Sequence, residues 1–241
     1  MHVQIVAARD NVRHADALRL AFALRHRVFV EKRGWEMLRK SDGLDIDSHD
    51  TGDAVHILVL DAGRVMAYAR LIPGGFLIAA KADPDRLRKA AGGAIIYGLS
   101  RFCIDPEARS RTHNAVSRVW LFRAALDYAL RKKIGGLMFD TDPSLIFMLK
   151  VLGFRLENIG EAAPLAGRLQ QPVIMRVDAS TLTHLSEKIS TWSPFMDKDT
   201  LTNATSVVGG LLSIGCRNSP SPCIPSSHHE SARSTAGQDI L

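Results

Sequence analysis

The sequence predicts a mixed α/β fold in which helices pack on a central sheet, and three observations support this class. Alternating or continuously apolar runs of strand length recur through the first 178 residues. Stretches with helical periodicity separate several of these runs. Their order is a strand and a helix, then an antiparallel meander, then alternating strands and helices, which is typical of helices layered on a mixed sheet.

Residue patterns place the individual elements. We expect strands at residues 2–8, 54–60, 64–72, 95–104, 134–139 and 172–178, and helices at residues 15–30, 83–91, 114–133 and 144–152. Asp61-Ala62-Gly63 lies between two strand-like runs and predicts a hairpin turn. Gly153 is placed to end the last of these helices, before a strand that starts at Phe154.

Length and composition agree with one folded unit. The chain has 241 residues, of which 46% are hydrophobic and 23% are charged. That apolar content excludes a disordered chain, and a domain of this size builds a core without disulfides or metals. No apolar stretch approaches the roughly 20 residues of a membrane-spanning helix, so we expect no membrane insertion.

The composition changes at about residue 191. We expect residues 1–190 to form the folded domain, whereas residues 191–241 are rich in Ser and Pro and predict a disordered tail. The chain carries a net charge of +6. Residues 192–241 hold three basic and four acidic side chains, which leaves +7 on the first 191 residues. This positive charge suits an acidic partner, a phosphate-bearing substrate or nucleic acid equally well.

The cysteine content and the N-terminal residues bear on disulfides, metal binding and secretion. Cys103, Cys216 and Cys223 are too few and too scattered for a disulfide framework or a zinc site, so we expect no metal. The N-terminal residues show neither a basic region nor a long apolar run. We therefore expect no secretion signal and a cytoplasmic protein.

Residues 24–50 carry the densest group of chemically active side chains. Arg25 and Phe29 are four residues apart, so on a helix they share a face. Trp35 follows a helix break predicted at Gly34, and three aspartates then fall within six residues, at Asp45, Asp47 and Asp50. Taken singly, each of these residues is expected to be structural. Together, aromatic faces and carboxylates are the side-chain means of stabilising a sulfonium or ammonium cation, and this spacing favours such a site.

The pattern Arg25-x3-Phe29-x5-Trp35, followed by Asp47-x2-Asp50, closely resembles the N-terminal signature of the acyl-homoserine-lactone synthases, also called autoinducer synthases. Arg70 in Ala-Arg-Leu-Ile-Pro and the run Ser100-Arg101-Phe102 match later motifs of that family in the same order, so the resemblance covers about residues 1–185. It implies a GNAT-like fold and an acyltransferase that makes a quorum-sensing signal. Such an enzyme acylates the amine of S-adenosylmethionine from an acyl thioester and then closes the lactone, releasing 5′-methylthioadenosine.

The resemblance also implies two groups of site residues. The substrate-binding group consists of Arg25, Phe29, Trp35, Phe102 and Cys103. The catalytic group consists of Asp47, Asp50, Arg70, Ser100 and Arg101. No cofactor is implied, because S-adenosylmethionine and the thioester are both substrates. Cys103, considered by itself, is interpreted as a buried small hydrophobe rather than a nucleophile.

The chemistry needs a proton acceptor for the amine and donors for the tetrahedral oxyanion. The family often has a glutamate two residues before the Ser-Arg-Phe serine, but this chain has Gly98 there. We expect Asp47 or Asp50 to take the proton through water; otherwise the enzyme is impaired. The backbone of Phe102 to Ile104 is the expected oxyanion site, if its neighbouring strand splays away. Lactone closure needs mainly orientation of the reacting atoms.

The resemblance implies an acyl donor that is either acyl carrier protein or acyl-coenzyme A, and we slightly prefer the carrier protein because most members of that family use it. The N-terminal motif more closely resembles a branch that uses coenzyme A with branched or aromatic acids. Basic side chains that could meet either donor are Arg109, Arg111, Arg118, Arg123, Arg131, Lys132, Lys133 and Lys150. Nucleic acid becomes an improbable partner once these motifs are identified.

Two alternative functions remain open. The first is a GNAT-type N-acyltransferase that uses acetyl-coenzyme A, but residues 106–114 lack the glycines of its pyrophosphate-binding loop. The second is a catalytically impaired regulator that binds S-adenosylmethionine, for which Gly98 is the sole support.

Overall fold

One large sheet organises the protein. The computed structural model describes residues 1–7, 12–50, 52–75, 81–107 and 111–192. The main sheet has the order β1-β2-β3-β5-β6-β10-β7, with β9 also on β10, and its strands are antiparallel except for the parallel pair β5–β6. These strands are β1 (His2–Ala7), β2 (Val55–Asp61), β3 (Arg64–Pro73), β5 (Ile95–Ile104), β6 (Ile134–Thr141), β7 (Leu156–Asn158), β9 (Ala163–Leu165) and β10 (Arg168–Arg176). A separate short pair joins β4 (Lys81–Ala82) to β8 (Gly160–Glu161).

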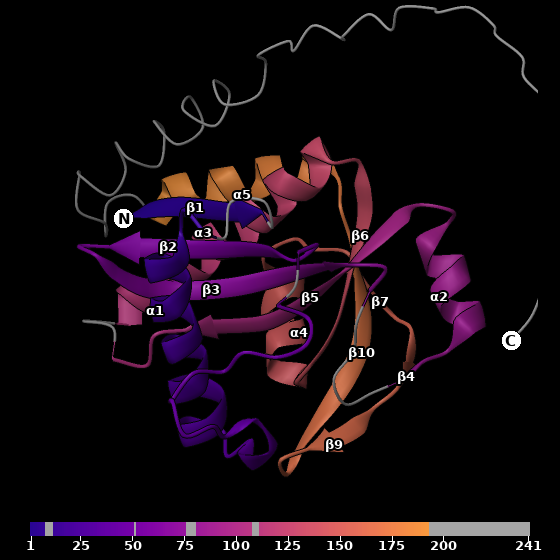
Figure 1. Ribbon diagram of the computed structural model, residues 1–241. Coiled ribbons are helices and arrows are strands. Elements are labelled where there is room, and N and C mark those ends of the chain that lie inside the picture. Colours follow the sequence, from indigo (N-terminus) through magenta and orange to yellow (C-terminus); the bar gives the residue numbers. More distant parts are fainter. Residues whose placement is uncertain (8–11, 51, 76–80, 108–110, 193–241) are drawn as a thin grey trace, which may run out of the picture.

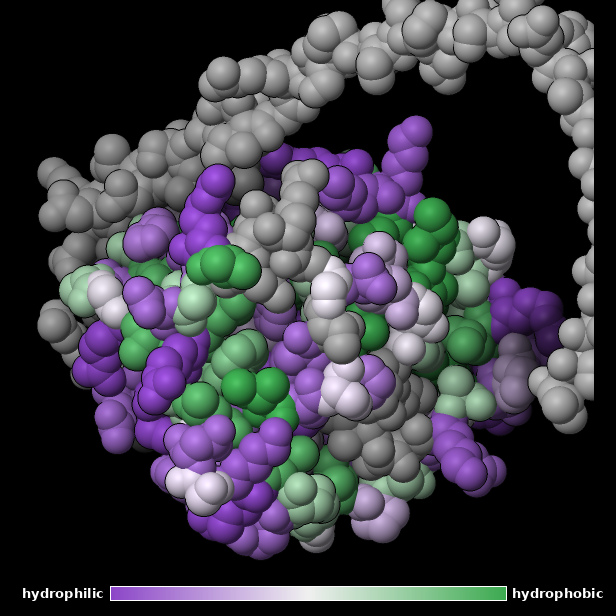
Figure 2. All heavy atoms as spheres, in the orientation of Figure 1, coloured by the Kyte–Doolittle hydropathy of each residue, from purple (hydrophilic) through white to green (hydrophobic). Residues whose placement is uncertain are grey.

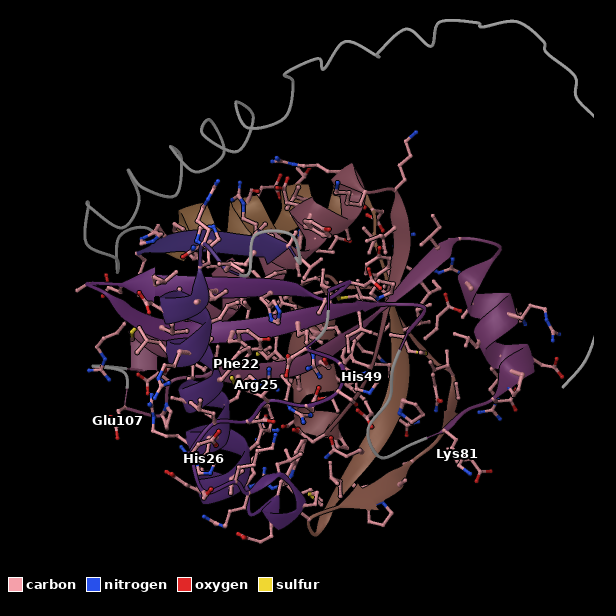
Figure 3. The ribbon with its side chains drawn as sticks, in the orientation of Figure 1. Phe22, Arg25, His26, His49, Lys81 and Glu107 are labelled. Atoms are coloured by element: carbon pink, nitrogen blue, oxygen red, sulfur yellow. The ribbon has the colours of Figure 1, made fainter. Side chains whose placement is uncertain are left out.

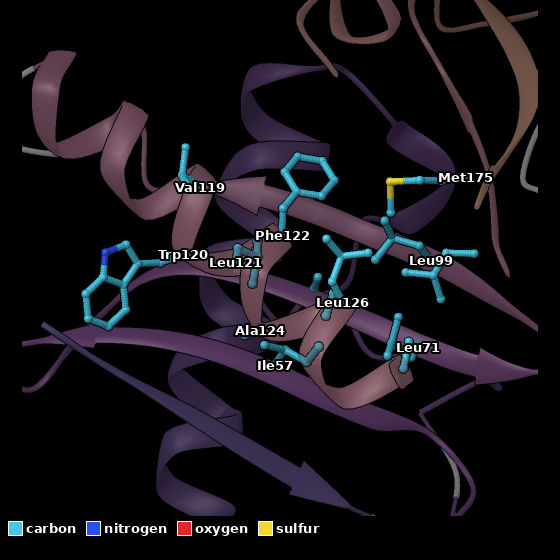
Figure 4. Packing of buried hydrophobic residues seen from close by; sticks show 14 of the residues in the cluster. Ile57, Leu71, Leu99, Val119, Trp120, Leu121, Phe122, Ala124, Leu126 and Met175 are labelled. Atoms are coloured by element: carbon cyan, nitrogen blue, oxygen red, sulfur yellow. The ribbon is translucent and has the colours of Figure 1, made fainter. Parts of the chain in front are cut away.

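Helices cover both faces of this sheet. On one face lies α1 (Ala15–His26), and on the other lie α3 (Arg111–Arg131), α4 (Pro143–Val151) and α5 (Ala179–Trp192), while α2 (Pro84–Ala91) flanks one end (Figure 1). The larger hydrophobic cluster packs α3 and α5 on the sheet, with Leu121, Phe122 and Leu126 against Leu71 and Leu99 (Figure 4). A second cluster packs α1 on the opposite face. Within the described residues, no helix is long and apolar enough to cross a membrane.

Local sequence explains the ends of the elements. Asp83 and Asp142 cap α2 and α4 by accepting hydrogen bonds from backbone N–H groups of the first turn. The predicted hairpin turn is confirmed: Asp61 pairs with Arg64, and Ala62 and Gly63 both have positive φ, as a two-residue turn of this hand requires. Gly153 follows α4 with φ +87°, which confirms the predicted end of that helix.

The seven predicted strands, including the one expected after Gly153, and the four predicted helices are all present, with differences at their ends. The helix expected at 15–30 is α-helical only to His26, and Arg27–Lys32 (η2) forms a π-helix. The last predicted strand ends at Arg176 rather than 178, and the strand expected to begin at Phe154 begins at Leu156. One helix, α5, was not predicted. Its signals are Asp178, which caps it by accepting from the Thr181 N–H, and the helical spacing of Leu182 and Leu185. The predicted disordered tail lies outside the described residues.

Candidate functional site

Three polar residues form a row across adjacent strands on the face that α1 covers. His56 of β2 pairs with Arg70 of β3, and Arg70 pairs with Ser100 of β5. All three are buried. Because side chains alternate along a strand, this register brings the three onto one face, and the Arg70 Nε donates to the Ser100 Oγ at 3.1 Å. The row forms the floor of the site.

A β-bulge adds Arg101 to the same face. Between the pairs Arg70–Ser100 and Tyr68–Cys103, β5 has two residues where β3 has one, and Arg101 has φ +52°. A regular strand would turn Arg101 to the opposite face from Ser100. With the extra residue, Arg101 joins the site, while Phe102 stacks on Phe122 of α3 with ring centroids 4.4 Å apart. The bulge therefore allows consecutive residues to serve one site.

The loop after η3 (Glu36–Leu38) brings three aspartates to three arginines. Asp45 accepts from the Nε atoms of Arg101 at 2.7 Å and Arg25 at 3.2 Å. Asp50 accepts from Arg25 Nη1 at 2.8 Å and Nη2 at 3.0 Å. Arg70 Nη1 donates to Asp47 and to Asp50, at 2.6 Å in each case. The six charges cancel, so the cluster is a neutral network that fixes the loop on the sheet.

Burial and charge distinguish the three carboxylates. The side chains of Asp45 and Asp50 are 1% and 2% exposed, whereas that of Asp47 is 20% exposed. Burial alone would raise the pKa of Asp47 and Asp50, but hydrogen bonds and positive charge from Arg70, with Arg101 at Asp47 and Arg25 at Asp50, hold both pKa values below their ordinary range. Asp47 is therefore an ionised carboxylate at the open edge of the network.

Arg25 lies behind the network, on the side of α1 that faces the sheet (Figure 3). Its guanidinium is fully buried, and it donates to Asp45, Asp50 and the hydroxyl of Tyr68. The role of Arg25 in substrate binding stays a prediction, because its donors are engaged within the protein in this conformation. The geometry gives Arg25 the task of holding the aspartate loop.

Two aromatic rings stand beside the network. Phe29 of η2 and Trp35 are in contact, with ring centroids 4.8 Å apart. The Arg101 guanidinium lies 5.5 Å from the Phe29 centroid and 5.9 Å from the Trp35 centroid. Both rings line a small cavity of about 70 Å³ that also meets Ser100 and Arg101. The predicted aromatic residues therefore share a cavity with Ser100 and Arg101, and Arg101 connects that cavity to the rest of the charged network.

That cavity lies where two parallel strands separate. In the described residues, β5 and β6 pair only from Ile95 to Gly98 of β5, and the cavity lies beyond, between Leu99–Phe102 and Phe139–Asp142. An extended chain can enter such a splay beside the open strand edge. Phe102, Phe122 and Phe154 form a row of contacting rings on the α3 side. The splay expected beside Phe102 is present, and Phe102 and Phe122 of this row line the cavity there.

Cys103 is buried in the cluster between α1 and the sheet. Burial raises the pKa of its thiol to about 12, so the thiol stays protonated and weakly nucleophilic. This agrees with its interpretation as a small hydrophobe; it lines only a larger neighbouring cavity. No group of three or more His, Cys, Asp or Glu side chains in the described part of the chain could hold a metal ion.

Four residues outside the predicted site also contribute to it. Asp45 is one of the three aspartates that stand out in the sequence, but its bridge between Arg25 and Arg101 depends on the fold. Tyr68 and His56 form a buried pair beneath Arg25, with 2.7 Å between the hydroxyl and Nδ1. Arg33 lines both cavities. A polar residue at an otherwise apolar strand position, as at His56, is the signal that could have revealed the pair.

Residues 9–185 match the family model described as autoinducer synthase. An isovaleryl-homoserine lactone synthase of Bradyrhizobium diazoefficiens is 41% identical over 71 residues, which is 30% of this chain and 32% of that protein. The match therefore spans only about a third of that relative. A probable acyl-homoserine-lactone synthase of Sinorhizobium fredii is 27% identical over 192 residues, covering 77% of this chain and 92% of that protein.

Among solved structures, a CoA-dependent acyl-homoserine lactone synthase, BjaI, determined with SAM and isopentyl-CoA, superposes with a TM-score of 0.65. It is 24% identical, and the match covers 78% of this chain and 89% of that one, which establishes likeness of fold. The mixed α/β fold with helices on a central sheet and the acyltransferase class expected from the sequence are confirmed. The chain belongs to the autoinducer synthase family.

Proposed function

We propose that this enzyme acylates the α-amine of S-adenosylmethionine from an acyl thioester and then closes the homoserine lactone, releasing 5′-methylthioadenosine. One observation carries the proposal. The neutral network of three arginines and three aspartates meets the cavity at Arg101, which donates to Asp47 at 2.9 Å and lies over the rings of Phe29 and Trp35, where β5 and β6 separate. The amine of S-adenosylmethionine and the carbonyl of an acyl thioester can therefore meet at this cavity.

Asp47 holds the amine in the first step. Its carboxylate is ionised and partly exposed, so it can accept a hydrogen bond from the ammonium form. Its low pKa makes it a weak base, so we propose that the proton passes by way of Asp47 to water. Asp50 is engaged by two arginines and is nearly fully buried, which suits it to support Asp47 rather than to touch the amine.

The unpaired edge of β5 is where the thioester carbonyl would bind. Beyond Gly98, the strand is no longer paired with β6 in the described residues. We propose that backbone N–H groups between Phe102 and Ile104 receive the oxyanion as the amine attacks. The thiolate then leaves, and an amide remains on the S-adenosylmethionine nitrogen. In the second step the carboxylate attacks its own γ-carbon and expels the neutral thioether, which needs orientation more than chemical assistance.

The acyl donor is proposed to be a coenzyme A thioester of a short or branched acid, in place of the slight preference for the carrier protein. The isovaleryl-homoserine lactone synthase and the CoA-dependent BjaI are the relatives that support this choice. The cavity at the splay has a volume of about 70 Å³ and is lined by Phe102 and Phe122, so it suits a short acyl chain. Both proposed substrates are cytoplasmic metabolites, so we propose that the enzyme works in the cytoplasm.

The decisive experiment supplies S-adenosylmethionine and isovaleryl-CoA to purified protein and detects products by mass spectrometry. We expect an acyl-homoserine lactone and 5′-methylthioadenosine in equal amounts. Trp35→Ala and Asp47→Ala should abolish both, whereas the matched surface variant Asp53→Asn should not. No lactone from wild-type protein with isovaleryl-, acetyl- and aryl-CoA and with acyl carrier protein thioesters would refute the proposal. Binding of S-adenosylmethionine without any product would instead support the impaired regulator.

A further inference from the structure

A buried histidine and a buried tyrosine lie behind the charge network, and the proposed reaction steps use neither. His56 of β2 and Tyr68 of β3 are each 0% exposed. The Tyr68 hydroxyl lies 2.7 Å from His56 Nδ1 and 3.3 Å from Arg25 Nη1. Figure 2 shows the face that carries α1, where small hydrophobic groups lie among hydrophilic residues, and the pair lies beneath α1. Polar groups sealed in this way are costly unless they are hydrogen-bonded, so the direction of each bond matters.

The chemistry of each group fixes which one donates. A guanidinium has no acceptor, so Arg25 donates and the Tyr68 oxygen accepts. Within the described residues, the hydroxyl hydrogen meets no acceptor other than His56 Nδ1, and a ring nitrogen that accepts carries no proton. Burial lowers the pKa of His56 to about 4 and raises the pKa of Tyr68, so both side chains are neutral at neutral pH. His56 is therefore protonated at Nε2 alone.

The other ring nitrogen shows that packing does not explain a histidine at this position. His56 Nε2 is buried and has no hydrogen-bond partner in the part of the chain that the structure describes. The imidazole instead meets the ring of Phe22 at 74°, with centroids 5.9 Å apart. A buried polar atom without a partner costs about 1–3 kcal/mol, and an apolar side chain would avoid that cost. The contact at Nδ1 is therefore what the histidine contributes.

The tyrosine that His56 contacts holds Arg25 from one side. The guanidinium carbon of Arg25 lies 5.4 Å from the Tyr68 ring centroid and 5.1 Å from that of Phe22, which precedes it on α1 (Figure 3). The Phe22 carbonyl also accepts from the Asp45 backbone N–H at 3.2 Å, so this turn of α1 anchors the aspartate loop. Arg25 Nη1 donates to both the Tyr68 hydroxyl and Asp50. A hydroxyl hydrogen turned toward that guanidinium would oppose this arrangement.

We propose that His56 is a positioning residue for S-adenosylmethionine binding: by accepting the Tyr68 hydrogen at Nδ1, it turns the hydroxyl oxygen toward Arg25. Arg25 in turn holds Asp45 and Asp50 in the network that meets the substrate cavity. The inference rests on the proposed function, because S-adenosylmethionine is the ligand that the network serves. A neutral imidazole orients the hydroxyl without adding a fourth positive charge to the three arginines and three aspartates.

The test separates the acceptor at Nδ1 from the bulk of the ring. His56→Asn keeps an acceptor oxygen the same number of bonds from the backbone as Nδ1, whereas His56→Leu fills similar space without one. We expect His56→Leu to raise the KM for S-adenosylmethionine about tenfold, the scale of one lost hydrogen bond to a charged group, and to change kcat by less than about twofold. His56→Asn should restore most of the affinity. His2→Leu, the same change at an exposed position of the neighbouring β1, is the control and should alter neither constant.

Two measurements that need no turnover separate this inference from the proposed function. Calorimetry with S-adenosylmethionine alone should give the same order of Kd values, and NMR of the ring nitrogens should show His56 protonated at Nε2 in the wild type. Tyr68→Phe should abolish that preference and weaken binding about tenfold, which keeps the test valid if His56→Leu does not fold.

Equal effects of His56→Asn and His56→Leu, wild-type binding by both variants, or a ring protonated at Nδ1 would overturn the role of His56 even if lactone forms. The expected order of Kd values in a protein that makes no lactone would uphold the role and refute the reaction. Absence of S-adenosylmethionine binding by folded wild-type protein would overturn both.

Discussion

Asp45→Asn tests whether the buried charge network holds the site together. Asp45 is 1% exposed and joins Arg25 and Arg101, with Nε–O distances of 3.2 and 2.7 Å. The substitution keeps the shape but removes the negative charge, so two buried guanidinium groups outnumber their partners. One such pair, at about 4 Å and an effective dielectric of about 20, is worth about 4 kcal/mol. Asp47 and the asparagine oxygen offset part of the loss.

We therefore expect Asp45→Asn to lower the free energy of unfolding by about 3–5 kcal/mol, the range for breaking one partner of a buried ion pair. Urea denaturation followed by circular dichroism gives this value. Asp53→Asn, the same change at an exposed position, is the control and should shift it by less than about 0.5 kcal/mol. Equal stability of the two variants would refute the reasoning that these charges depend on one another.

Three further predictions concern acidity, the buried pair and the cleft. The pKa values of Asp47 and Asp50 are depressed in the folded state, so their contribution to stability is complete above the unfolded pKa of about 4 and is lost as the pH falls below it. Below about pH 4, the free energy of unfolding of Asp47→Asn, measured by urea denaturation, should therefore decline less steeply than that of the wild type. Tyr68→Phe removes the hydroxyl that contacts both Arg25 and His56, so we expect the free energy of unfolding to fall by about 1–3 kcal/mol and the KM for S-adenosylmethionine to rise. Burial lowers the pKa of His56 to about 4, so in the wild type its imidazole should show no NMR titration between pH 5 and 8. Phe122→Leu shortens the aromatic row, and in competition between isovaleryl-CoA and octanoyl-CoA the fraction of longer lactone, measured by mass spectrometry, should rise; an unchanged product ratio would show that this row does not limit chain length.

Much of the fold followed from sequence alone. Alternation along residues 54–72 and the turn at Ala62-Gly63 predicted the meander, although a register shift between Val59 and Leu60, which alternation does not predict, is what sets His56 opposite Arg70. Asp142 and Gly153 marked both ends of α4. These features depend on neighbours within a few residues, so local patterns suffice to predict them. The motif spacing likewise predicted that Arg25, Asp47 and Arg101 lie together, and the structure brings them into one charge network.

The remaining features depend on contacts between distant segments. Strict alternation turns Arg101 away from Ser100, and only the bulge opposite β3 brings both to the site. The π-helix at Arg27–Lys32, the bridging of Arg25 and Arg101 by Asp45, and the contact of Tyr68 with both Arg25 and His56 have no local signature. The sequence by itself determined which chemical groups are present and most of the elements that carry them. The tertiary structure decided which groups meet, because burial and charge pairing act between residues far apart in the chain, such as Asp45 and Arg101, which are 56 positions apart.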